Sequence, residues 1–455
     1  MAVAFLLEVF AAHRDDDAII WHDKPYRYGW LMEKITAARA AIHEQSIGSG
    51  SIVAIEADFS PQSVAMFLAL IEAGAVIVPL TASVAAQREE FLATAQVEVV
   101  VSIDARDNVR FTRLDVIATH QHYQTLRAAG HPGLVLFSSG STGKSKAAVH
   151  DLVNILEKFR VPRHRLRTIT FLLYDHIGGI NTMLYTLSNG GTIVTVDERT
   201  PDGVLRSVAA HRVELLPTSP TFLNLVLFSE AYSRHDLGSL KTVTYGTEPM
   251  PESTLRRFHA LFPDIRLLQT YGLSEVGILR STSRSSDSLW VKVGGEGFQT
   301  RVVDGILHIK AQSTMLGYLN APNPFTDDGW FITGDEVEVD GEWLRILGRK
   351  SEMINVGGQK VYPAEVESVI QDMEGVADST VFGQPNTITG QIVCANVTLT
   401  GEEDPRAFAR RLKKFCHDRL APFKVPVKIE VLAAPLHGAR FKKMRQTYGA
   451  AASKN

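Results

Sequence analysis

The sequence predicts an α/β protein with a large N-terminal domain of layered βα units and a smaller α+β C-terminal domain. Three observations support this class. Short apolar runs alternate with longer helix-like stretches over most of the chain. From about Arg349 onward the pattern changes to a shorter mixture of helix and strand signals. The length of 455 residues allows two or three domains of roughly 150 residues each. We therefore divide the chain into 1–349 and 350–455.

The first stretch, 1–16, is apolar but carries Glu8 and has no basic region ahead of it. A secretory signal peptide combines a basic start with an uninterrupted apolar run. We therefore expect an amphipathic helix that covers a core, not a cleaved signal.

The strands expected in the N-terminal domain are near-continuous apolar runs, which are typical of parallel strands buried on both faces. A longer helical stretch at 60–74 is the clearest of the helices between them. Gly74, Gly190 and Gly191 fall between helix and strand signals, where a left-handed backbone often ends the helix. The expected strands are 51–57, 97–103, 133–139, 191–197 and 241–246.

The C-terminal part reads as a compact α+β module. It contains strand-like and helix-like segments in mixed order, and its second helix is rich in basic residues. The expected helices are 365–373 and 405–420, and the expected strands are 379–385, 391–399 and 428–432.

Composition excludes several classes of function. A net charge of -3 gives no general attraction to nucleic acid or to an anionic membrane, and no apolar segment approaches the length needed to cross a bilayer. Cys394 and Cys416 are too few for a disulfide framework and lie in no metal-binding cluster. We therefore expect a cytoplasmic enzyme without a nucleic-acid or membrane partner.

A loop directly behind the apolar strand at 133–139 is suited to holding phosphate. Glycines allow close backbone approach, hydroxyl groups act as donors, and lysines add positive charge. The P-loop pattern does not match, because it requires glycine where the chain has Ser138. Taken alone, the segment also fits a polar surface turn. The candidate phosphate-binding residues are Ser138, Ser139, Gly140, Ser141, Thr142, Gly143, Lys144 and Lys146.

Two further motifs follow in a fixed order: Tyr-Gly-Leu-Ser-Glu at 271–275 and a long block at 329–367. With the phosphate loop, they make the chain resemble the adenylate-forming superfamily, which includes acyl and aryl CoA ligases, luciferases and peptide-synthetase adenylation domains. Ser145 stands where that family usually has proline, and Ser274 where it usually has threonine. The resemblance covers most of the chain, since 53–80 is also similar to the family's early strand and helix.

The resemblance implies two half-reactions. A carboxylate first attacks the α-phosphate of Mg-ATP to give an acyl adenylate and pyrophosphate, and a thiol then displaces AMP. The implied cofactors are ATP, Mg²⁺, and CoA or phosphopantetheine. The C-terminal domain is expected to be mobile and to rotate between the two steps. Ser351 stands at the hinge position, where the family has Asp or Lys, and Gly357 and Gly358 would meet the thiol acceptor.

The resemblance also assigns the nucleotide site. Glu275 would bind Mg²⁺ and serve catalysis, because a hard carboxylate oxygen suits that ion. Asp335 and Arg349 would hold the ribose hydroxyls, although alone they would be read as a turn residue and a surface cation. Tyr271 could stack on the base. The other residues expected around the nucleotide are Gly246, Thr247, Glu248, Thr270, Gly272 and Ser274.

Lys442 is the expected catalytic lysine. The family usually ends in Gly-Lys-Ile-x-Arg, and Lys442 with Arg445 keeps the Lys-x-x-Arg spacing. Phe441 replaces the glycine, and Lys443 is a competing assignment. An ammonium between the carboxylate and the α-phosphate would stabilise the developing charge. The alternative is a solvated basic tail.

The acid pocket is expected around His176, which occupies the position of the histidine that faces the carboxylate in acyl and aryl CoA ligases. An isolated histidine more often has a structural role, so motif position carries this assignment. Asp175 suggests an alternative, because amino-acid adenylation domains use a nearby aspartate to bind the ammonium group. The spacing favours a simple carboxylic acid. The remaining pocket residues are Gly178, Gly179, Tyr245, Gly246 and Gly272.

Three functions remain open at this point. The first is an AMP-forming ligase that joins an aryl or modest acyl acid to CoA. The second is a free-standing adenylation enzyme that loads the phosphopantetheine of an acyl carrier protein. The third is a non-catalytic homologue that binds nucleotide or acid, which the unusual serines and altered C-terminal motif permit.

Overall fold

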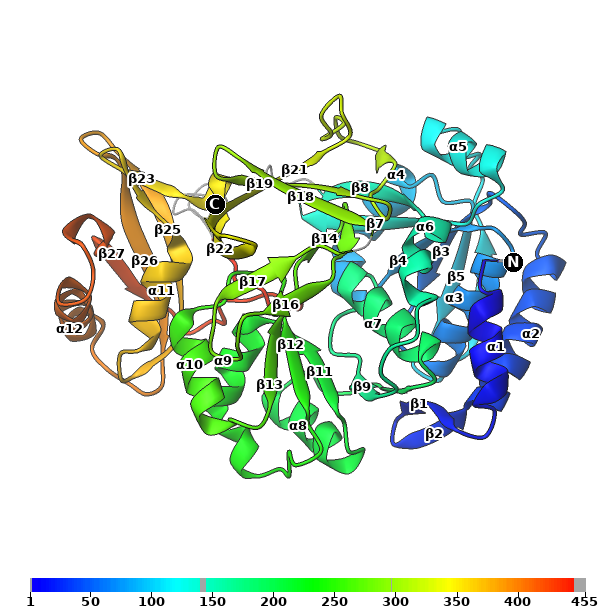
Figure 1. Ribbon diagram of the computed structural model, residues 1–455, viewed down its shortest axis with the longest axis horizontal. Coiled ribbons are helices and arrows are strands. Elements are labelled where there is room, and N and C mark those ends of the chain that lie inside the picture. Colours follow the sequence, from blue (N-terminus) through cyan, green and yellow to red (C-terminus); the bar gives the residue numbers. More distant parts are fainter. Residues whose placement is uncertain (1, 140–144, 296, 446–455) are drawn as a thin grey trace.

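The computed structural model describes residues 2–139, 145–295 and 297–445. It confirms the predicted α/β class, with a large N-terminal part and a smaller C-terminal part at one end (Figure 1). Two seven-stranded sheets and one six-stranded sheet make up the larger part, and a five-stranded sheet makes up the smaller part.

The first seven-stranded sheet has the order β20-β8-β7-β4-β3-β5-β6. Its centre, β7-β4-β3-β5, is parallel, whereas β6, β8 and β20 run antiparallel to their neighbours. The parallel centre explains the near-continuous apolar runs of the sequence. The bounds are β3 Ile52–Glu56, β4 Val76–Leu80, β5 Val99–Ile103, β6 Val109–Arg113, β7 Gly133–Ser139, β8 Ser145–Asp151 and β20 Gly317–Tyr318.

The second seven-stranded sheet has the order β13-β12-β11-β9-β10-β1-β2. All of its pairs are parallel except the hairpin of β1 and β2. The carboxyl ends of β11, β12 and β13 therefore lie at one edge, which is where the site is built. The bounds are β1 Asp17–Trp21, β2 Lys24–Arg27, β9 Arg167–Ile169, β10 Thr192–Val194, β11 Leu215–Thr218, β12 Thr242–Tyr245 and β13 Arg266–Gln269.

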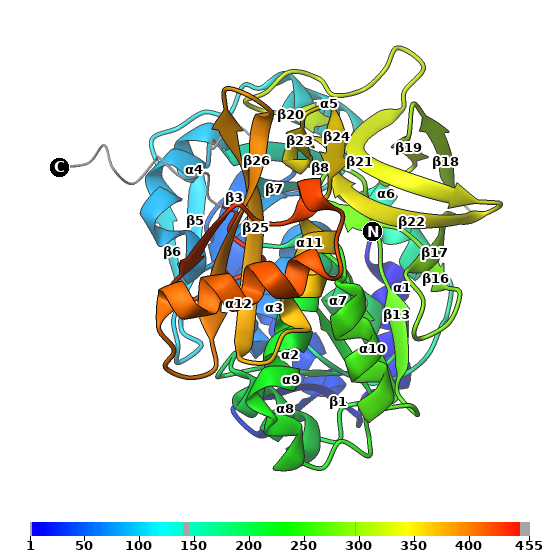
Figure 2. The same cartoon turned by 90° about the vertical axis from the view of Figure 1, so that its left-hand side faces the viewer.

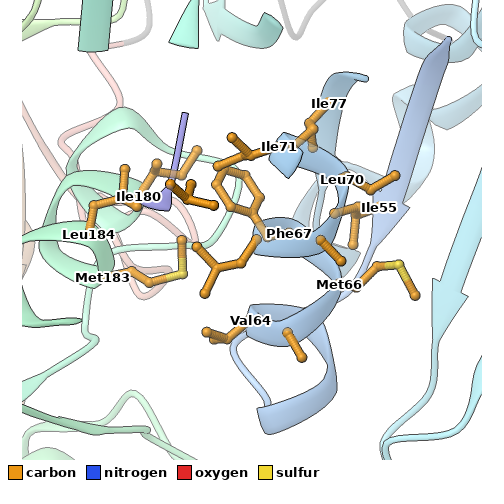
Figure 3. Close-up of a cluster of buried hydrophobic side chains, with 14 of the residues drawn as sticks. Ile55, Val64, Met66, Phe67, Leu70, Ile71, Ile77, Ile180, Met183 and Leu184 are labelled. Atoms are coloured by element: carbon orange, nitrogen blue, oxygen red, sulfur yellow. The ribbon is translucent and has the colours of Figure 1, made fainter. Parts of the chain in front are cut away.

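Five of the described helices contribute side chains to one apolar core between these two sheets: α1 (Ala4–Ala12), α2 (Tyr28–Glu44), α3 (Pro61–Glu72), α6 (Leu152–Leu156) and α7 (Ile177–Ser188). The start of α3 is fixed because Ser60 caps its first turn and Pro61 occupies the first helical position. Figure 3 shows Phe67 of α3 between the side chains of α7, such as Ile180, and those of the first sheet. This core holds α7 in place beside the site.

The outer faces of the two sheets carry their own helices. Side chains of α4 (Arg88–Thr94) and α5 (Gln121–Ala129) join the outer core of the first sheet. Those of α8 (Pro201–Ala210), α9 (Pro220–Ser229) and α10 (Glu252–Leu261) join the outer core of the second. The short α6 (Leu152–Leu156) follows β8. Each sheet is thus covered on both faces, as parallel strands require.

A third, antiparallel sheet has the order β16-β17-β22-β21-β19-β18, and the sequence analysis did not predict it. One face of this sheet packs on a core, and buried residues alternate with more exposed ones along β17 and the first part of β21, whereas four consecutive residues of β19 are buried. The bounds are β16 Ser281–Ser283, β17 Trp290–Val293, β18 Phe298–Val303, β19 Ile306–Ala311, β21 Phe331–Asp340 and β22 Trp343–Arg349.

The C-terminal part has a separate core, formed by residues between Ile354 and Cys416 (Figure 2). The predicted boundary after Arg349 coincides with the end of β22 and the start of the 3₁₀ turn Lys350–Glu352. Separate movement of this part stays a prediction. The bounds are β23 Ile354–Val356, β24 Gln359–Val361, α11 Pro363–Gln371, β25 Val376–Asn386, β26 Gly390–Leu399, α12 Pro405–His417 and β27 Lys428–Val431.

Among the described residues, no helix has both the length and the apolar character that a membrane span requires.

Candidate active site

A cavity of about 850 Å³ runs along one face of β11, β12 and β13 to their carboxyl ends. Thr218, Gly246 and Thr270 line it, each at or just after the end of one of these strands. One wall is formed by α7, and the hairpin 437–443 of the C-terminal part forms another. The crevice at the carboxyl ends of parallel strands is the common ligand site of α/β proteins.

The predicted phosphate loop connects β7 and β8 and reaches the cavity. Ser138 and Ser145 line it, and Ser139 pairs with Ser145 across the hairpin. Lys146 lies with its Nζ 5.2 Å from the centre of the Tyr318 ring. The remaining predicted loop residues, Gly140, Ser141, Thr142, Gly143 and Lys144, lie outside the described part of the chain.

Glu275 lines the same cavity, and one of its carboxylate oxygens accepts a hydrogen bond. The Tyr318 hydroxyl donates to its Oε1 at 2.6 Å. The neighbouring Ser274 also lines the cavity, and its carbonyl accepts from His150 Nε2 at 2.6 Å. In the part of the chain that the structure describes, no group of three or more metal-ligating side chains gathers. A cation at Glu275 would therefore take its other ligands from phosphate and water oxygens.

The loop after β12 brings backbone close to the cavity. A Cβ on Gly246 would lie 2.7 Å from both the carbonyl oxygen and the hydroxyl of Thr270, so only glycine fits there. Thr247 has φ 73°, a conformation that β-branched residues rarely adopt, and strain of this kind gathers at functional loops. Both residues line the cavity.

Glu248 and Tyr245 are placed differently from the sequence interpretation. Glu248 Oε1 accepts from the backbone N–H of Thr221 at 2.8 Å, and its Oε2 accepts from the backbone N–H of Lys443 at 3.1 Å. Glu248 thus connects α9 to the C-terminal hairpin and is absent from the cavity wall. Tyr245 is buried in the outer core of the second sheet and is likewise absent from the wall.

Asp335 and Arg349 are opposite partners in the β21–β22 ladder, which brings Arg349 Nε to 3.5 Å from Asp335 Oδ1. The Tyr271 hydroxyl donates to Asp335 Oδ2 at 2.5 Å. Tyr271 is buried and absent from the cavity wall, so it positions Asp335 in this structure. Burial raises the pKa of Asp335 even though Arg349 and the Tyr271 hydrogen bond oppose that shift.

His176 caps the N-terminus of α7. Its Nδ1 accepts from the backbone N–H of Gly178 at 3.0 Å, so in the neutral ring the proton is on Nε2. Burial, followed by the charges of Arg440 and Lys442, lowers the pKa of His176 to about 3. The imidazole is therefore neutral at physiological pH, and it lines the cavity with an N–H available.

The glycines after His176 have separate roles. Gly178 lines the cavity, whereas Gly179 is absent from its wall and packs against the preceding loop. A Cβ on Gly179 would lie 2.0 Å from the carbonyl oxygen of Leu173, which no side chain could accept. Gly272, in β14 (Gly272–Leu273), also lines the cavity beside β15 (Gly277–Ile278).

The C-terminal hairpin separates the two candidate lysines. Lys443 Nζ donates to the carbonyl of Ser379 at 2.6 Å and lies 3.4 Å from Glu367 and 3.5 Å from Asp378. Arg445 forms a second pair with Glu367, with Nη2 at 2.9 Å from Oε2. Burial alone would raise the pKa of Glu367, but Arg445 and Lys443 lower it to about 2. Lys443 is thus held inside the C-terminal part.

Both lysines line the cavity, but Lys442, unlike Lys443, has no ion pair among residues 2–139, 145–295 and 297–445. Protein surrounds it closely enough that burial lowers its pKa, and the charge of Arg349 lowers it further. The positive charge of Lys442 lowers the pKa of both Asp335 and His176. Lys442 is therefore near both the predicted ribose side and the predicted acid side of the cavity.

Sequence reasoning missed two neighbours of Lys442. Arg440 Nη2 lies 3.3 Å from Asp175 Oδ2, which also accepts from the Thr81 hydroxyl at 3.0 Å. Asp175 is therefore paired with a cation of the protein and is not free for a substrate ammonium group. Phe441 has φ 47°, and its ring packs 5.2 Å from that of Phe171. The only sequence signal was the missing glycine at this position.

The predicted hinge and thiol-acceptor residues lie away from the cavity. Ser351 is exposed in the 3₁₀ turn after β22. Gly357 and Gly358 form the tight turn between β23 and β24, with φ values of 59° and 87°. None of the three lines the cavity. The predicted contact of Gly357 and Gly358 with the thiol acceptor therefore requires another domain arrangement.

Two family models match this chain. The model of the AMP-binding enzyme matches residues 7–319, and that of the AMP-binding enzyme C-terminal domain matches residues 365–439. The chain belongs to the AMP-binding enzyme family. The first match covers both seven-stranded sheets and α7, but Arg349 lies beyond it, and the second match ends at residue 439, before Lys442.

Among curated relatives of this AMP-binding enzyme, the long-chain-fatty-acid–CoA ligase FadD13 of Mycobacterium tuberculosis is 27% identical over 84% of this chain and 84% of its own length. The indoleacetate–CoA ligase of Aromatoleum aromaticum is 28% identical over 66% of this chain and 63% of its own.

Solved structures share the fold. An anthranilate CoA ligase, AuaEII, in complex with anthranoyl-AMP has a TM-score of 0.81 at 20% identity, over 97% of this chain and 95% of its own. The amide bond synthetase McbA of Marinactinospora thermotolerans has a TM-score of 0.74 at 21% identity, over 97% of both chains. At these identities the likeness concerns the architecture.

Proposed function

We propose that this AMP-binding enzyme activates an aryl or modest acyl carboxylic acid with ATP and then transfers the acyl group from its adenylate to the thiol of CoA. The observation that carries the proposal is the convergence of His176, Arg349 and Lys442 on one cavity from three separate parts of the chain. Curated CoA ligases among the relatives support the choice of reaction.

The acid carboxylate would bind at the N-terminal end of α7. His176 offers its Nε2–H there, and the positive end of the helix dipole gives this end a partial positive charge. Because the pKa of His176 is about 3, the ring acts as a hydrogen-bond donor and does not exchange protons during the reaction. Its role is to orient one carboxylate oxygen toward the nucleotide.

Lys442 would lie where the two anions meet. Attack of a carboxylate on a phosphate brings negative charges together, and an ammonium between them offsets the repulsion and stabilises the transition state. Asp335 would accept hydrogen bonds from the ribose hydroxyls beside Arg349, and the loop Gly246–Thr247 would border the base. Ser138 and Lys146 would contact the departing pyrophosphate.

The residues present also fit Mg²⁺. Glu275 has one oxygen bonded to Tyr318 and a second with no hydrogen bond from the described residues, so it could supply one hard ligand beside the phosphates. The ion would neutralise phosphate charge when bound.

Transfer of the acyl group to a thiol requires the hairpin 437–443 to move out of the cavity. Lys442 and its neighbours fill the side of the cavity from which a thiol would need to approach. We propose that the part 350–455 rotates about Ser351 and brings the turn Gly357–Gly358 to the pantetheine arm, which passes closely along a glycine backbone. Both cysteines are free and buried, which fits a reducing cytoplasm.

The test is a panel of carboxylic acids assayed for pyrophosphate release and for exchange of labelled pyrophosphate into ATP. Separate reactions compare the possible acyl acceptors, because a CoA ligase and an amide bond synthetase share this fold. Formation of AMP and acyl-CoA with free CoA is expected. Turnover only with an acyl carrier protein, or only with an amine, would replace the proposed acceptor. Absence of exchange with every acid would refute catalysis itself.

A further inference from the structure

The acid wall of the cavity is formed by one stripe of α7. Gly178, Asn181, Thr182 and Tyr185 line it, at the three- and four-residue spacing of a helix face. The stripe begins beside His176, where the carboxylate would bind, and continues for about two helical turns, or roughly 10 Å. Side chains along it therefore meet successively deeper parts of the acid.

Two polar side chains on this stripe keep a donor without an acceptor among the described residues: the amide of Asn181 and the hydroxyl of Tyr185. The hydroxyl of Thr182 donates back to the Gly178 carbonyl at 2.8 Å, and the Tyr185 oxygen accepts from the backbone of His164. Of the two free donors, only that of Asn181 is oriented by a second side chain. Asn181 Oδ1 accepts from Lys158 Nζ at 2.6 Å. Among the described residues, no atom accepts from the Asn181 amide nitrogen.

Lys158 fixes which end of the amide points to it. As an ammonium, Lys158 has only donors to offer, so the Asn181 oxygen faces Lys158 and the NH₂ group faces away. Lys158 Nζ also donates to the carbonyl of Ile278 at 2.9 Å, which holds it between α7 and β15. No carboxylate of the described chain pairs with it, and burial lowers its pKa to about 7.

A purely structural bridge would not need this arrangement. Lys158 could hold α7 to β15 through the Ile278 carbonyl, and an apolar residue at 181 would complete the wall of an apolar acid pocket. A buried lysine without a counter-ion costs free energy, and so does an amide donor without a partner. A ligand oxygen beside Asn181 would supply the acceptor that the amide lacks.

We propose that Asn181, oriented by Lys158, donates a hydrogen bond to an oxygen of the substrate acid about one helical turn beyond its carboxylate. This inference rests on the proposed function and narrows its substrate class to acids that carry an ether, carbonyl or similar oxygen acceptor. Asn181 lies five residues after His176, so the acceptor would be roughly 5 to 8 Å from the carboxylate site.

Isosteric pairs of acids test the proposal on the wild-type protein. Each pair exchanges one CH₂ group for oxygen: 3- and 4-methoxybenzoate against 3- and 4-ethylbenzoate, and 4-methoxybutanoate against hexanoate. kcat/KM for adenylate formation is measured for each. For at least one pair, the oxygen-containing acid is expected to react about tenfold faster, the value of one hydrogen bond whose partner would otherwise stay unpaired.

Two variants identify the residues. Asn181→Leu should remove the preference while the all-carbon acid reacts at least as well as in the wild type. Lys158→Met should reduce the preference, because kcat/KM should fall more for the oxygen-containing acid, which depends on the orientation of Asn181, than for its all-carbon partner. Lys158→Arg, which keeps the donors, should retain part of the preference. Thermal unfolding of each variant controls for loss of fold.

The outcomes distinguish a failure of the Asn181 inference from a failure of the proposed function. Equal kcat/KM within every pair, or a preference that persists in Asn181→Leu, overturns the inference while the proposed function stands. Equal loss on both members of a pair in Lys158→Met assigns Lys158 a structural role only and overturns its part. No adenylate from any acid contradicts the proposed function, and the inference falls with it.

Discussion

Asp175 and Arg440 form an ion pair at 3.3 Å between two parts of the chain that are 265 residues apart. Asp175 is 4% exposed and follows β9, whereas Arg440 is at the tip of the hairpin that carries Lys442. The pair therefore exists only while the hairpin is inserted. The ion pair therefore helps to hold Lys442 in the cavity, and it must break when the C-terminal part moves.

Breaking this pair should favour the step that needs the hairpin removed. Asp175→Asn keeps the shape and removes the charge, leaving a half-exposed Arg440 without its partner. We expect adenylation to slow about tenfold, less than for a fully buried pair, and thioester formation from supplied acyl adenylate to be unchanged or faster. Single-turnover measurements of each half-reaction decide this.

A double-mutant cycle with Arg440→Gln gives the control. If the pair acts as proposed, the double variant should lose no more adenylation activity than either single variant. Additive losses would show that Asp175 acts through Thr81 or the fold and not through Arg440.

Substitution of Lys442 should reduce adenylation, whereas substitution of Lys443 should reduce stability. Lys442→Ala removes an ammonium that faces the cavity, and we expect adenylation to fall by about 10²- to 10³-fold with an unchanged melting temperature. Lys443→Met leaves Glu367 and Asp378 with less charge compensation inside the C-terminal part, so it should cost about 3 kcal/mol of stability or more. Steady-state rates and thermal unfolding on the same samples separate the effects.

The opposite pattern would reassign the catalytic lysine. Lys443→Met that keeps its melting temperature and loses adenylation would make Lys443 the reacting cation, against the contacts seen here.

The pH dependence should follow Lys442. Its pKa is lowered by burial and by Arg349, so the free enzyme loses this charge at a pH below the ordinary value for lysine. Since adenylation needs the ammonium, kcat/KM should fall as pH rises through that lowered pKa. His176 contributes nothing near neutrality, because its pKa of about 3 keeps it neutral there. In Lys442→Arg the alkaline fall should disappear, and its persistence would assign it to another group.

The sequence could predict the pairing of Asp335 with Arg349, because spacing along the chain follows structure there. Their binding of a nucleotide stays a prediction. Asp335 and Arg349 belong to one motif because a hairpin places them opposite each other, so their separation in sequence is set by the ladder. The buried strands were also recognisable, since a parallel centre requires continuous apolar runs.

Contacts between distant segments could not be read from the sequence. The choice between Lys442 and Lys443 depends on Glu367, which lies 76 residues before Lys443, and on which side of a hairpin each lysine faces. Tyr271 looked like a base-stacking ring, but its hydroxyl is held by Asp335. The strands of the third sheet alternate buried and exposed residues only in part, even along the ten residues of β21, so their periodicity gives a weak signal.

Phe441 offers a test of how the hairpin is anchored. Its φ of 47° is unfavourable for any residue with a Cβ, by about 1–2 kcal/mol, and its ring lies 5.2 Å from Phe171 and 5.3 Å from Phe222. Aromatic contacts of this kind contribute about 0.5–1.5 kcal/mol each beyond the area they bury. The packing of the ring thus offsets the strain of the backbone only while the hairpin is inserted.

Two substitutions separate these contributions. Phe441→Ala removes the ring and keeps the backbone strain, so it should slow adenylation more than Phe441→Gly, which removes both. Because Lys442 follows directly in the chain, each variant should affect adenylation and leave thioester formation from supplied acyl adenylate intact. If Phe441→Gly proves slower than Phe441→Ala, strain at this position is not what the ring offsets, and flexibility at the tip controls how Lys442 is positioned.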